Sequence, residues 1–518
     1  MFKPVQDTWL FLSRLARIKI LVFKLLFLTP GKPEVRFRMF FEQAGGAFIK
    51  LGQILSLRYD LLPPRYTTEL LNLLSRVEVL PFRAMEEVFI GEIGQAPEKY
   101  FKKFNPNPIA SASISQVYRA TLWSGEEVAV KIKRPHIDDI FITDFALASF
   151  LAGFVGMLGI VRSVNLEEAV AEFVIWTRRE LDFTYEANNA AVLEEHAKRH
   201  PNTVIPKTYS DLSTSRVLIT EFMAGIYRLD TVIDKLTKNP NFAADLLRDT
   251  RIDLSQMAYY FMLDGMRQYF IDGFFHADPH PANVFFLSDN RLGYFDFGIM
   301  GEVDGRRVEL LKIIHGIAKH DLRAVSQAFL NYSKQNLSKE ADLLKRYHGA
   351  DYAHYEKVLD KIEEIMTDNF REELEVILAP WYEERGDGYA GSASLIFSKL
   401  LLRAEKYSVY VPREMVIFFR SLIIADMVAM KIAPDFNMIK ALNLFFREFP
   451  LAKAEALIES ASHKEELAPE IEPIIDLEFE ELMELRAAER ERLEATAERL
   501  SDLVLYYAEH YEEVRKML

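Results

Sequence analysis

The chain has 518 residues, half of them hydrophobic, with a net charge of −14 and no cysteine. This length exceeds what one hydrophobic core usually organises, so we expect more than one domain. The acidic balance argues against nucleic acid as a partner, and the lack of cysteine excludes disulfides, thiolate zinc sites and cysteine nucleophiles.

The first segment of interest is an apolar run from Trp9 to Thr29 that basic residues interrupt. Those charges make it a poor membrane span, and no cleavage site of a secretory signal follows. At helical spacing Arg14, Arg17 and Lys24 fall on one side. Two interpretations stay open, namely a basic helix lying on an anionic membrane surface and an amphipathic helix docked on the protein itself.

Residues 30–105 are predicted to be helical, with breaks at prolines. One helix there carries the sequence Lys50-Leu-Gly-Gln53 among bulky apolar residues, and polar groups in such surroundings need partners. Residues 106–135 instead predict a β-hairpin. Alternation along its second strand places Lys131 on the face opposite Val130, where it could reach nucleotide phosphates.

A loop of small residues leads into this hairpin and contains Ala110, Ser111, Ala112 and Ser113. Small side chains let backbone N–H groups approach phosphate oxygens. Alanine and serine allow less backbone freedom than glycine, so the ordinary glycine-rich nucleotide loop is an imperfect comparison.

Residues 137–198 return to helix. The 17 residues from Phe145 to Val161 carry no charge, but they are slightly short for a membrane span, so we expect a buried helix rather than lipid contact. The segment Glu180–Glu186 is also predicted to be helical, which would place Asp182 and Glu186 on one face. A helical carboxylate is what a phosphate-binding lysine needs as its partner.

The strongest chemical signal begins at Asp278, which is followed five residues later by Asn283 and thirteen residues after that by Asp296. A strand, turn and strand pattern fills residues 284–295, so a hairpin should return Asp296 toward Asn283. An acid beside the phosphoryl acceptor and two oxygen ligands for Mg²⁺ are the groups that kinase-like phosphotransfer needs.

The end of the chain differs in composition from the rest. From Lys464 to Leu518 there are 17 acidic and 7 basic residues. Residues 477–518 have helical spacing, which predicts a long solvated helix or a coiled-coil contact.

Taken together, these motifs resemble the UbiB/AarF family of atypical kinase-like proteins, in order from about residue 42 to about residue 301. Three elements carry the resemblance: Lys50-x-Gly52-Gln53, the Ala/Ser-rich loop and Glu180-x-Asp182. The resemblance implies an α+β, mainly helical, bilobal protein-kinase-like fold. It also implies an N-terminal helical extension over the active site, and the helical spacing of residues 477–518 adds a C-terminal helical tail.

The resemblance also assigns roles to matching positions. Asp278 would be the catalytic aspartate, Lys131 the phosphate-binding lysine paired with Glu186, and Asn283 and Asp296 the Mg²⁺ ligands. Ala110, Ser111, Ala112 and Ser113 would form the loop over the phosphates, and the connector with Glu221 and Met223 would meet the adenine. Lys50 and Gln53 would enter the cleft, with Lys50 near Glu180 and Asp182.

We divide the chain accordingly into five parts. They are a basic membrane-associating segment (1–40), a helical extension with the Lys-x-Gly-Gln motif (41–105), a kinase-like small lobe with a helical insert (106–225), a helical large lobe with the catalytic segment (226–455), and an acidic helical tail (456–518).

The function implied by the resemblance is that of an atypical kinase or ATPase that uses ATP/ADP and Mg²⁺. It would support the biosynthesis or homeostasis of an isoprenoid quinone, ubiquinone-like, or of a related prenyl lipid. We expect a cytoplasmic protein, peripheral on the inner face of the membrane, with nucleotide, membrane lipid or quinone intermediates as partners. The acidic tail would contact protein partners.

Two alternatives belong to other functional classes. One is a scaffold that uses nucleotide only as a conformational switch. The other is a conventional protein or small-molecule kinase, against which the Lys50–Gln53 element speaks because an inserted lysine should block a bulky acceptor.

Overall fold

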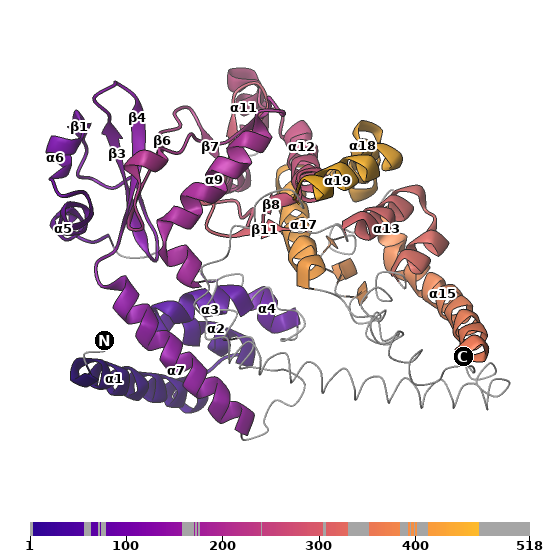
Figure 1. The fold of residues 1–518 in the computed structure, drawn as a ribbon, viewed down its shortest axis with the longest axis horizontal. Helices are drawn as coiled ribbons and strands as arrows, with labels where there is room; N and C mark the ends of the chain where they lie inside the picture. The colour runs from indigo at the N-terminus through magenta and orange to yellow at the C-terminus, as the bar shows by residue number, and fades with distance from the viewer. Residues whose placement is uncertain are drawn as a thin grey trace. The chain divides into compact units, whose positions relative to one another are not determined.

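The fold of the chain comes from a computed structural model (Figure 1). It describes residues 4–55, 64–70, 73, 79–157, 170, 174, 177–239, 241–303, 307–329, 352–383, 392–393, 395–397, 399–400 and 413–465. The predicted acidic helix at 477–518 lies outside these residues. The chain divides into two compact units, one of residues 1–257 with 276–300 and one of residues 258–275 with 301–518. The bounds of the five predicted parts stay a prediction.

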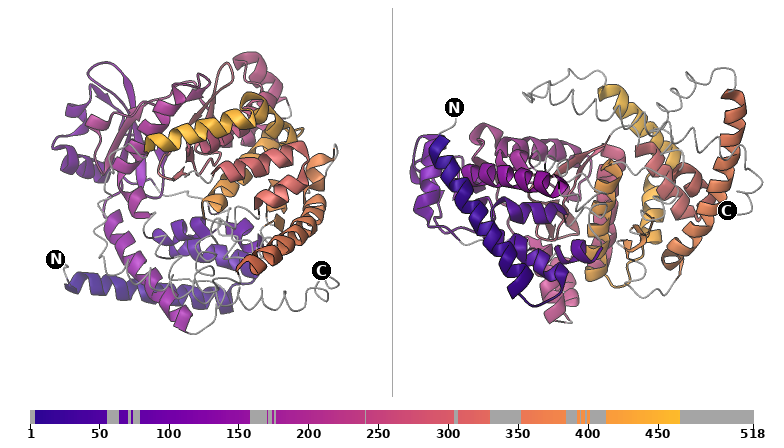
Figure 2. Two further views of the ribbon diagram at one scale, coloured as in Figure 1. Left: turned by 45° about the vertical axis from the view of Figure 1, so that its right-hand side comes forward. Right: turned by 90° about the horizontal axis from the view of Figure 1, so that it is seen from below.

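The first unit begins with the helices of the N-terminal extension. They are α1 (Pro4–Phe23), the π-helical turn η1 (Lys24–Leu28), α2 (Pro33–Ala44), α3 (Ala47–Leu55) and α4 (Pro64–Leu70). Helix α1 packs against α2 and against α7 (Ile137–Met157) (Figure 1, Figure 2). The helices predicted between residues 30 and 105 are thus confirmed in α2, α3 and α4, whereas the prediction is wrong at Lys103–Phe104, which form a strand.

Helix α1 docks through one face. Ile18, Leu21 and Leu25 are buried in a core shared with α2, α3 and α7. Arg14 belongs to the same buried face and pairs with Asp144 of α7. The predicted basic face is therefore wrong at Arg14, because position 14 continues the buried stripe, while Arg17 and Lys24 remain exposed.

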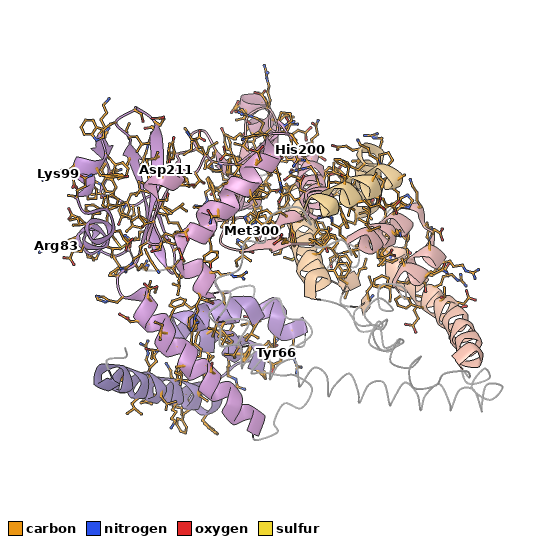
Figure 3. All side chains as sticks on the ribbon, viewed as in Figure 1. Tyr66, Arg83, Lys99, His200, Asp211 and Met300 are labelled. Carbon is orange, nitrogen blue, oxygen red and sulfur yellow. The ribbon has the colours of Figure 1, made fainter. Side chains whose placement is uncertain are left out.

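A five-stranded antiparallel sheet follows, flanked by α5 (Phe82–Ile93) and the short α6 (Pro97–Tyr100). Its strands are β1 (Lys103–Phe104), β2 (Ala110–Ser111), β3 (Ser115–Thr121), β4 (Glu127–Lys133) and β6 (Val217–Glu221), in the order β1-β3-β4-β6 with β2 beside β3. The predicted hairpin is confirmed as β3 and β4. On α5 and α6, Arg83 and Lys99 are exposed and point outward (Figure 3).

Alternation along the strands gives the sheet two covered faces. Val128 and Val130 of β4 pack with α5 in one core. Leu218 of β6 packs on the other side with α7 and with α9 (Phe183–Ala197). Lys131 is the register partner of Leu218, so its side chain lies on the α9 side of the sheet, as predicted.

The segment before α9 is not one continuous helix. Helical residues end at Leu181, Asp182 has extended backbone angles, and α9 begins at Phe183. The prediction of a continuous helix through Glu180–Glu186 is wrong. The Asp182 carboxylate accepts a hydrogen bond from the backbone N–H of Thr184, which caps the new helix in the manner expected of an aspartate.

A second sheet contains the hairpin that was predicted between Asn283 and Asp296. Its order is β5-β10-β9-β7, formed by β5 (Thr203–Val204), β7 (Tyr227–Arg228), β9 (Val284–Leu287) and β10 (Arg291–Tyr294). The predicted hairpin is confirmed as β9 and β10. Asp289 and Asn290 turn it with positive φ angles, which these two residue types tolerate. The 3-10 turn η2 (Ser210–Leu212) and the helices α10 (Leu229–Lys238) and α11 (Phe242–Thr250) complete this unit.

The second unit is built mainly from helices, and α12 (Leu254–Arg267) leads into it. The others are the π-helical turn η3 (Gln268–Asp272), α13 (Arg307–Lys319), α15 (Tyr352–Tyr382), α17 (Arg413–Ile432), α18 (Met438–Glu448) and α19 (Leu451–Glu465). The short strands β8 (Phe274–His276) and β11 (Met300–Glu302) pair with each other. Within the ranges given above, the structure contains no helix long and apolar enough to cross a membrane.

Candidate nucleotide-binding and catalytic site

A buried ion pair joins β4 of the five-stranded sheet to helix α9. The Nζ atom of Lys131 lies 2.9 and 2.7 Å from the two carboxylate oxygens of Glu186. Both side chains are largely shielded from water, at 16% and 8% exposure. Burial would lower the pKa of Lys131, but the carboxylates of Glu186 and Asp296 outweigh it and raise that pKa. The predicted pairing is present, and Lys131 stays a cation.

A second ion pair brings the N-terminal extension into the same region. Lys50 of α3 lies with its Nζ atom 2.5 Å from Glu180 Oε1, and both side chains are mostly buried. Burial would lower the pKa of Lys50, but the charges of Glu180, Asp296 and Asp278 raise it. The predicted approach of Lys50 to Glu180 is therefore present.

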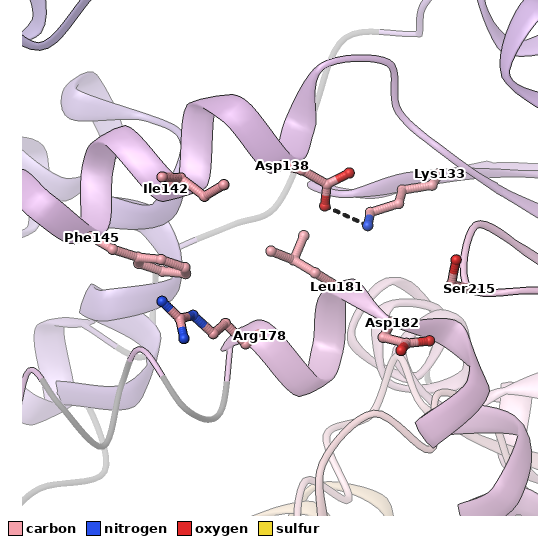
Figure 4. A pocket seen from close by; sticks show the side chains of 8 residues that line it. All are labelled: Lys133, Asp138, Ile142, Phe145, Arg178, Leu181, Asp182 and Ser215. Atoms are coloured by element: carbon pink, nitrogen blue, oxygen red, sulfur yellow. Dashed lines mark ion pairs between the residues drawn. The ribbon is translucent and has the colours of Figure 1, made fainter. Parts of the chain in front are cut away.

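The Asp182 carboxylate, which was also predicted to lie near Lys50, instead caps the N-terminus of α9. It lines a separate pocket with Lys133, Asp138 and Arg178, in which Lys133 pairs with Asp138 (Figure 4). Glu180 and Asp182, two residues apart, thus serve different purposes.

The loop after β8 holds the predicted catalytic aspartate and one predicted Mg²⁺ ligand together. The side-chain amide of Asn283 donates to the backbone carbonyl of Asp278 at 3.2 Å and lies 3.5 Å from its carboxylate. Because the nitrogen end of Asn283 faces Asp278, its oxygen is the end that can coordinate a cation.

His276, the buried last residue of β8, is a residue to which the sequence reasoning gave no role. Its Nε2 donates to the carbonyl of Phe295 at 3.1 Å, and its Nδ1 accepts the backbone N–H of Asp278 at 3.3 Å. Burial lowers the pKa of His276, so the ring is neutral and can make both bonds at once. His276 therefore ties the loop of Asp278 to the segment that bears Asp296. Its place two residues before Asp278 was the only signal in the sequence.

Asp296 follows β10 with a φ angle of 57°, a left-handed conformation that aspartate adopts more readily than most residues. Its carboxylate is 47% exposed and lies 4.0 Å from Lys131 Nζ. It also accepts the N–H of Gly298 at 3.3 Å. Partial loss of hydration would raise the pKa of Asp296, but the charges of Lys131 and Lys50 outweigh it and lower that pKa, so this carboxylate is ionised at neutral pH.

The small-residue loop is held from beneath by a residue that the sequence reasoning missed. Arg134, just past β4, donates from Nε to the carbonyl of Ala112 at 2.9 Å and from its guanidinium to the hydroxyl of Ser111 at 2.8 Å. The backbone N–H of Ala112 bonds to the carbonyl of Ser115. Strand β2, of Ala110 and Ser111, pairs with β3. The loop is thus fixed at four points, and Ser113 lies within it.

The remaining predicted positions lie on the same unit. Glu221 ends β6, and Met223 follows in the connector that leads to β7 of the second sheet. Gln53 belongs to α3, but its side chain is outside the described part of the structure. No contact in the described residues assigns Glu221, Met223 or Gln53 a ligand.

The donor set fits magnesium better than a transition metal. In the part of the chain that the structure describes, no group of three or more His, Cys, Asp or Glu side chains is arranged to hold a metal. Asn283 and Asp296 offer two oxygen donors. Mg²⁺ is typically held by one or two protein oxygens together with phosphate oxygens and water, so this pair suits it.

Fold and site together define a protein-kinase-like protein. The sequence model of the ABC1 atypical kinase-like domain matches residues 72–329. An uncharacterized protein of Synechocystis is 35% identical over 58% of this chain and 73% of its own length. An uncharacterized protein of Clostridium pasteurianum is 28% identical over 81% of this chain and 73% of its own length.

A further relative is a plant protein. The chloroplastic protein ACTIVITY OF BC1 COMPLEX KINASE 1 of Arabidopsis thaliana is 36% identical over 53% of this chain, which spans only 39% of that protein. The chain belongs to the ABC1 atypical kinase-like family, which the motifs indicated under the name UbiB/AarF.

Proposed function

We propose that this protein is an ATP- and Mg²⁺-dependent atypical kinase or ATPase. The observation that carries the proposal is a cluster of charged side chains within one compact unit. Lys131 forms an ion pair with Glu186, and its Nζ atom lies 4.0 Å from the carboxylate of Asp296. A cation held by a helical carboxylate and facing a second, ionised carboxylate is the arrangement that binds nucleotide phosphates with a metal ion.

Each residue would then have one task. Lys131 would bind nucleotide phosphate oxygens, and the fixed loop from Ala110 to Ser113 would lie over them. Asn283 and Asp296 would hold Mg²⁺, which would offset phosphate charge. Asp278, beside Asn283, would orient the group or water that receives the phosphoryl group.

The acceptor that we propose is an isoprenoid quinone precursor or a related prenyl lipid, or a water molecule if the protein acts as an ATPase. Membership of the family supports this, since the motifs that define the family are present in order. The adenine would meet the connector that contains Glu221 and Met223. Partner proteins that contact the acidic tail belong to the same proposal.

The outer surface of α1 and η1 supports attachment at the inner face of a membrane. Ile20, Phe23, Phe27 and Leu28 are 69%, 57%, 71% and 68% exposed. The basic residues Arg17, Lys19 and Lys24 are exposed around them. Apolar and aromatic side chains flanked by cations suit the interface of an anionic bilayer. We refer to these seven residues as the α1 surface.

A second candidate function is a scaffold switched by nucleotide. One observation favours it, because the charge of Lys50 acts on Asp278 and Asp296, the acids that the reaction would need. A cation fixed there would slow phosphotransfer without preventing nucleotide from binding. In this case Asp278→Asn would still bind ATP and would complement a deletion strain, whereas an enzyme would lose its function.

The test of the main proposal is the melting temperature of the protein with ATP or ADP, with and without Mg²⁺, for wild type and Asp296→Asn. Ligand at about 100 times its Kd stabilises a folded protein by about 2.7 kcal/mol. Asparagine tolerates the left-handed backbone of residue 296, so the variant removes the charge and keeps the fold.

We expect a Mg²⁺-dependent rise in melting temperature for wild type that Asp296→Asn lacks. No rise in wild type would overturn the nucleotide site. An equal, Mg²⁺-independent rise in both proteins would overturn the metal assignment alone.

A further inference from the structure

One buried carboxylate lies at the meeting point of three helices of the first unit. Asp144 of α7 is 1% exposed. Its Oδ1 accepts from Arg14 Nε of α1 at 2.7 Å, and its Oδ2 accepts from a terminal nitrogen of the same guanidinium at 2.9 Å. Its Oδ2 also accepts the backbone N–H of Ala47, the first residue of α3, at 2.9 Å.

These contacts make Asp144 the cap of α3, although it comes from a different helix. The first N–H groups of a helix have no partner within it, and a carboxylate placed there also meets the positive end of the helix dipole. Gly46, just before α3, has a φ angle of 59°. A Cβ atom at Gly46 would overlap Asp144 and crowd Arg14 and Ile140, so the turn is closely fitted to this junction.

Arg14 makes the junction depend on α1. Its guanidinium also donates to the carbonyl of Gly45 at 3.2 Å, so it holds both Asp144 and the turn before α3. The pair is buried, and removal of one partner of a buried ion pair leaves an uncompensated charge. The position of α3 is thus fixed by a residue of α1 through a residue of α7.

Helix α3 has nine residues, and Lys50 lies three residues after Ala47, less than one turn from the capped end. A shift of that end therefore moves Lys50 by a similar distance. The contact of Lys50 with Glu180 is 2.5 Å long, and both side chains are mostly buried.

We propose that Asp144 is a positioning residue for Lys50, and that Arg14 makes this positioning depend on α1. The functional consequence rests on the proposed function, because the charge that Lys50 places beside Asp278 and Asp296 matters for activity only if these acids serve a nucleotide site. The α1 surface lies on α1, the helix of Arg14, and on η1, which directly follows it, so whatever binds that surface acts on the helix that fixes Lys50.

The test is a zero-length crosslink made by a carbodiimide, which joins an amine to a carboxylate only where the two touch. The yield between Lys50 and Glu180 is measured by mass spectrometry on the full chain without nucleotide. The yield between Lys133 and Asp138, which are also 2.5 Å apart, is the internal reference.

In Arg14→Ala and in Asp144→Ala we expect the ratio of the two yields to fall by about fivefold or more, because the junction loses a buried charge partner. Asp144→Asn keeps an oxygen for Ala47 but places an amide against Arg14, so its ratio should fall less than that of Asp144→Ala. Arg14→Lys keeps a cation within reach of Asp144 and should restore most of the ratio.

Arg38→Ala is the matched control. It breaks another ion pair of the same extension, with Arg38 Nε 2.8 Å from Glu69, without touching Asp144. Its ratio should equal that of wild type.

Three results would overturn the proposal. They are an unchanged ratio in a folded Arg14→Ala or Asp144→Ala protein, an equal fall in Arg38→Ala, and a wild type that forms the reference crosslink but none at Lys50. Because no nucleotide is present, these outcomes are independent of the melting experiment that tests the proposed function.

Discussion

At the residue scale, the site depends on charges that are held against each other away from water. Lys131 and Glu186 are almost fully enclosed. Such a pair contributes little net stability compared with two apolar residues, but the loss of one partner is costly because the other charge stays buried. Because removal of both charges should cost less stability than removal of one, the structural role of Lys131 can be tested separately from its role in binding nucleotide.

Lys131→Met should lower the free energy of unfolding by about 3 kcal/mol, because Glu186 remains without its cation. The double variant Lys131→Met with Glu186→Met should regain most of that loss, since both charges are gone. The midpoint of urea unfolding measures both effects. Neither variant should show the rise in melting temperature with Mg²⁺ and ATP. A double variant that is restored in stability and still binds nucleotide would remove Lys131 from the proposed site.

The sequence predicted the contacts between residues that belong to the ordered motifs. It did not predict contacts between residues that lie outside those motifs. Lys131 pairs with Glu186 as predicted, and Asp296 lies 4.0 Å from Lys131, a contact that was not predicted. Arg14 and Asp144 are 130 residues apart, and no periodicity within either helix indicates that they form a pair. Arg14 was grouped with Arg17 and Lys24 on one side of the helix, and helical spacing alone does not say which side of a helix is covered.

At the element scale, helix α3 packs closely against its neighbours at Gly52. Gly52 of the Lys-x-Gly-Gln motif has no side chain because there is no space for one. A Cβ atom there would lie 2.5 Å from Leu73 Cδ1 and 2.7 Å from Phe41 Cγ of α2. The leucine methyl can move, but the Phe41 atoms lie at the root of the ring and cannot turn aside.

Gly52→Ala should therefore destabilise the protein even though alanine is the better helix former by about 1 kcal/mol. Overpacking of this kind costs about 1–3 kcal/mol, so the net change should be a loss of roughly 1 kcal/mol and a lower melting temperature. Gly91→Ala is the control, because Gly91 is also helical, in α5, and a Cβ atom there meets nothing within 4 Å. A Gly52→Ala protein that is as stable as Gly91→Ala would refute the packing argument.

Elements with a strong local signal were predicted well. The strands at β3, β4, β9 and β10 follow from alternation and from turn residues, and all four are present. The helix through Glu180–Glu186 was predicted wrongly, because aspartate occurs both within helices and at their N-termini. The hydrogen bond from the backbone N–H of Thr184 to the Asp182 carboxylate shows that Asp182 caps a new helix, and this bond is visible only in the folded chain.

At the scale of the whole molecule, the distribution of charge matters more than its sum. The net charge of −14 would repel an anionic membrane, yet the exposed cations Arg17, Lys19 and Lys24 are gathered on one helix with exposed apolar side chains. Interactions with a charged surface decay over about 8 Å at physiological salt, so the local patch decides whether the protein binds, and the distant acidic residues contribute little.

Phe27→Glu should weaken binding to vesicles that contain phosphatidylglycerol by about tenfold or more, since burial of a phenylalanine side chain stabilises by about 1.5–3 kcal/mol and the new carboxylate is repelled. Binding is measured by flotation of the full chain with such vesicles, and added salt should reduce it for wild type. Vesicles of neutral lipid should bind less, because they lack the charge that attracts Arg17, Lys19 and Lys24.

Trp123→Glu is the matched control for this experiment, since Trp123 lies in the turn between β3 and β4 and is 69% exposed, against 71% for Phe27. Both variants replace one exposed aromatic residue by one negative charge, so a general effect of charge would weaken both equally. Loss of binding in Phe27→Glu alone would assign the membrane contact to the α1 surface. Equal binding by Phe27→Glu and wild type would leave that surface without a membrane role, and α1 would then serve only to hold Asp144 and, through it, α3.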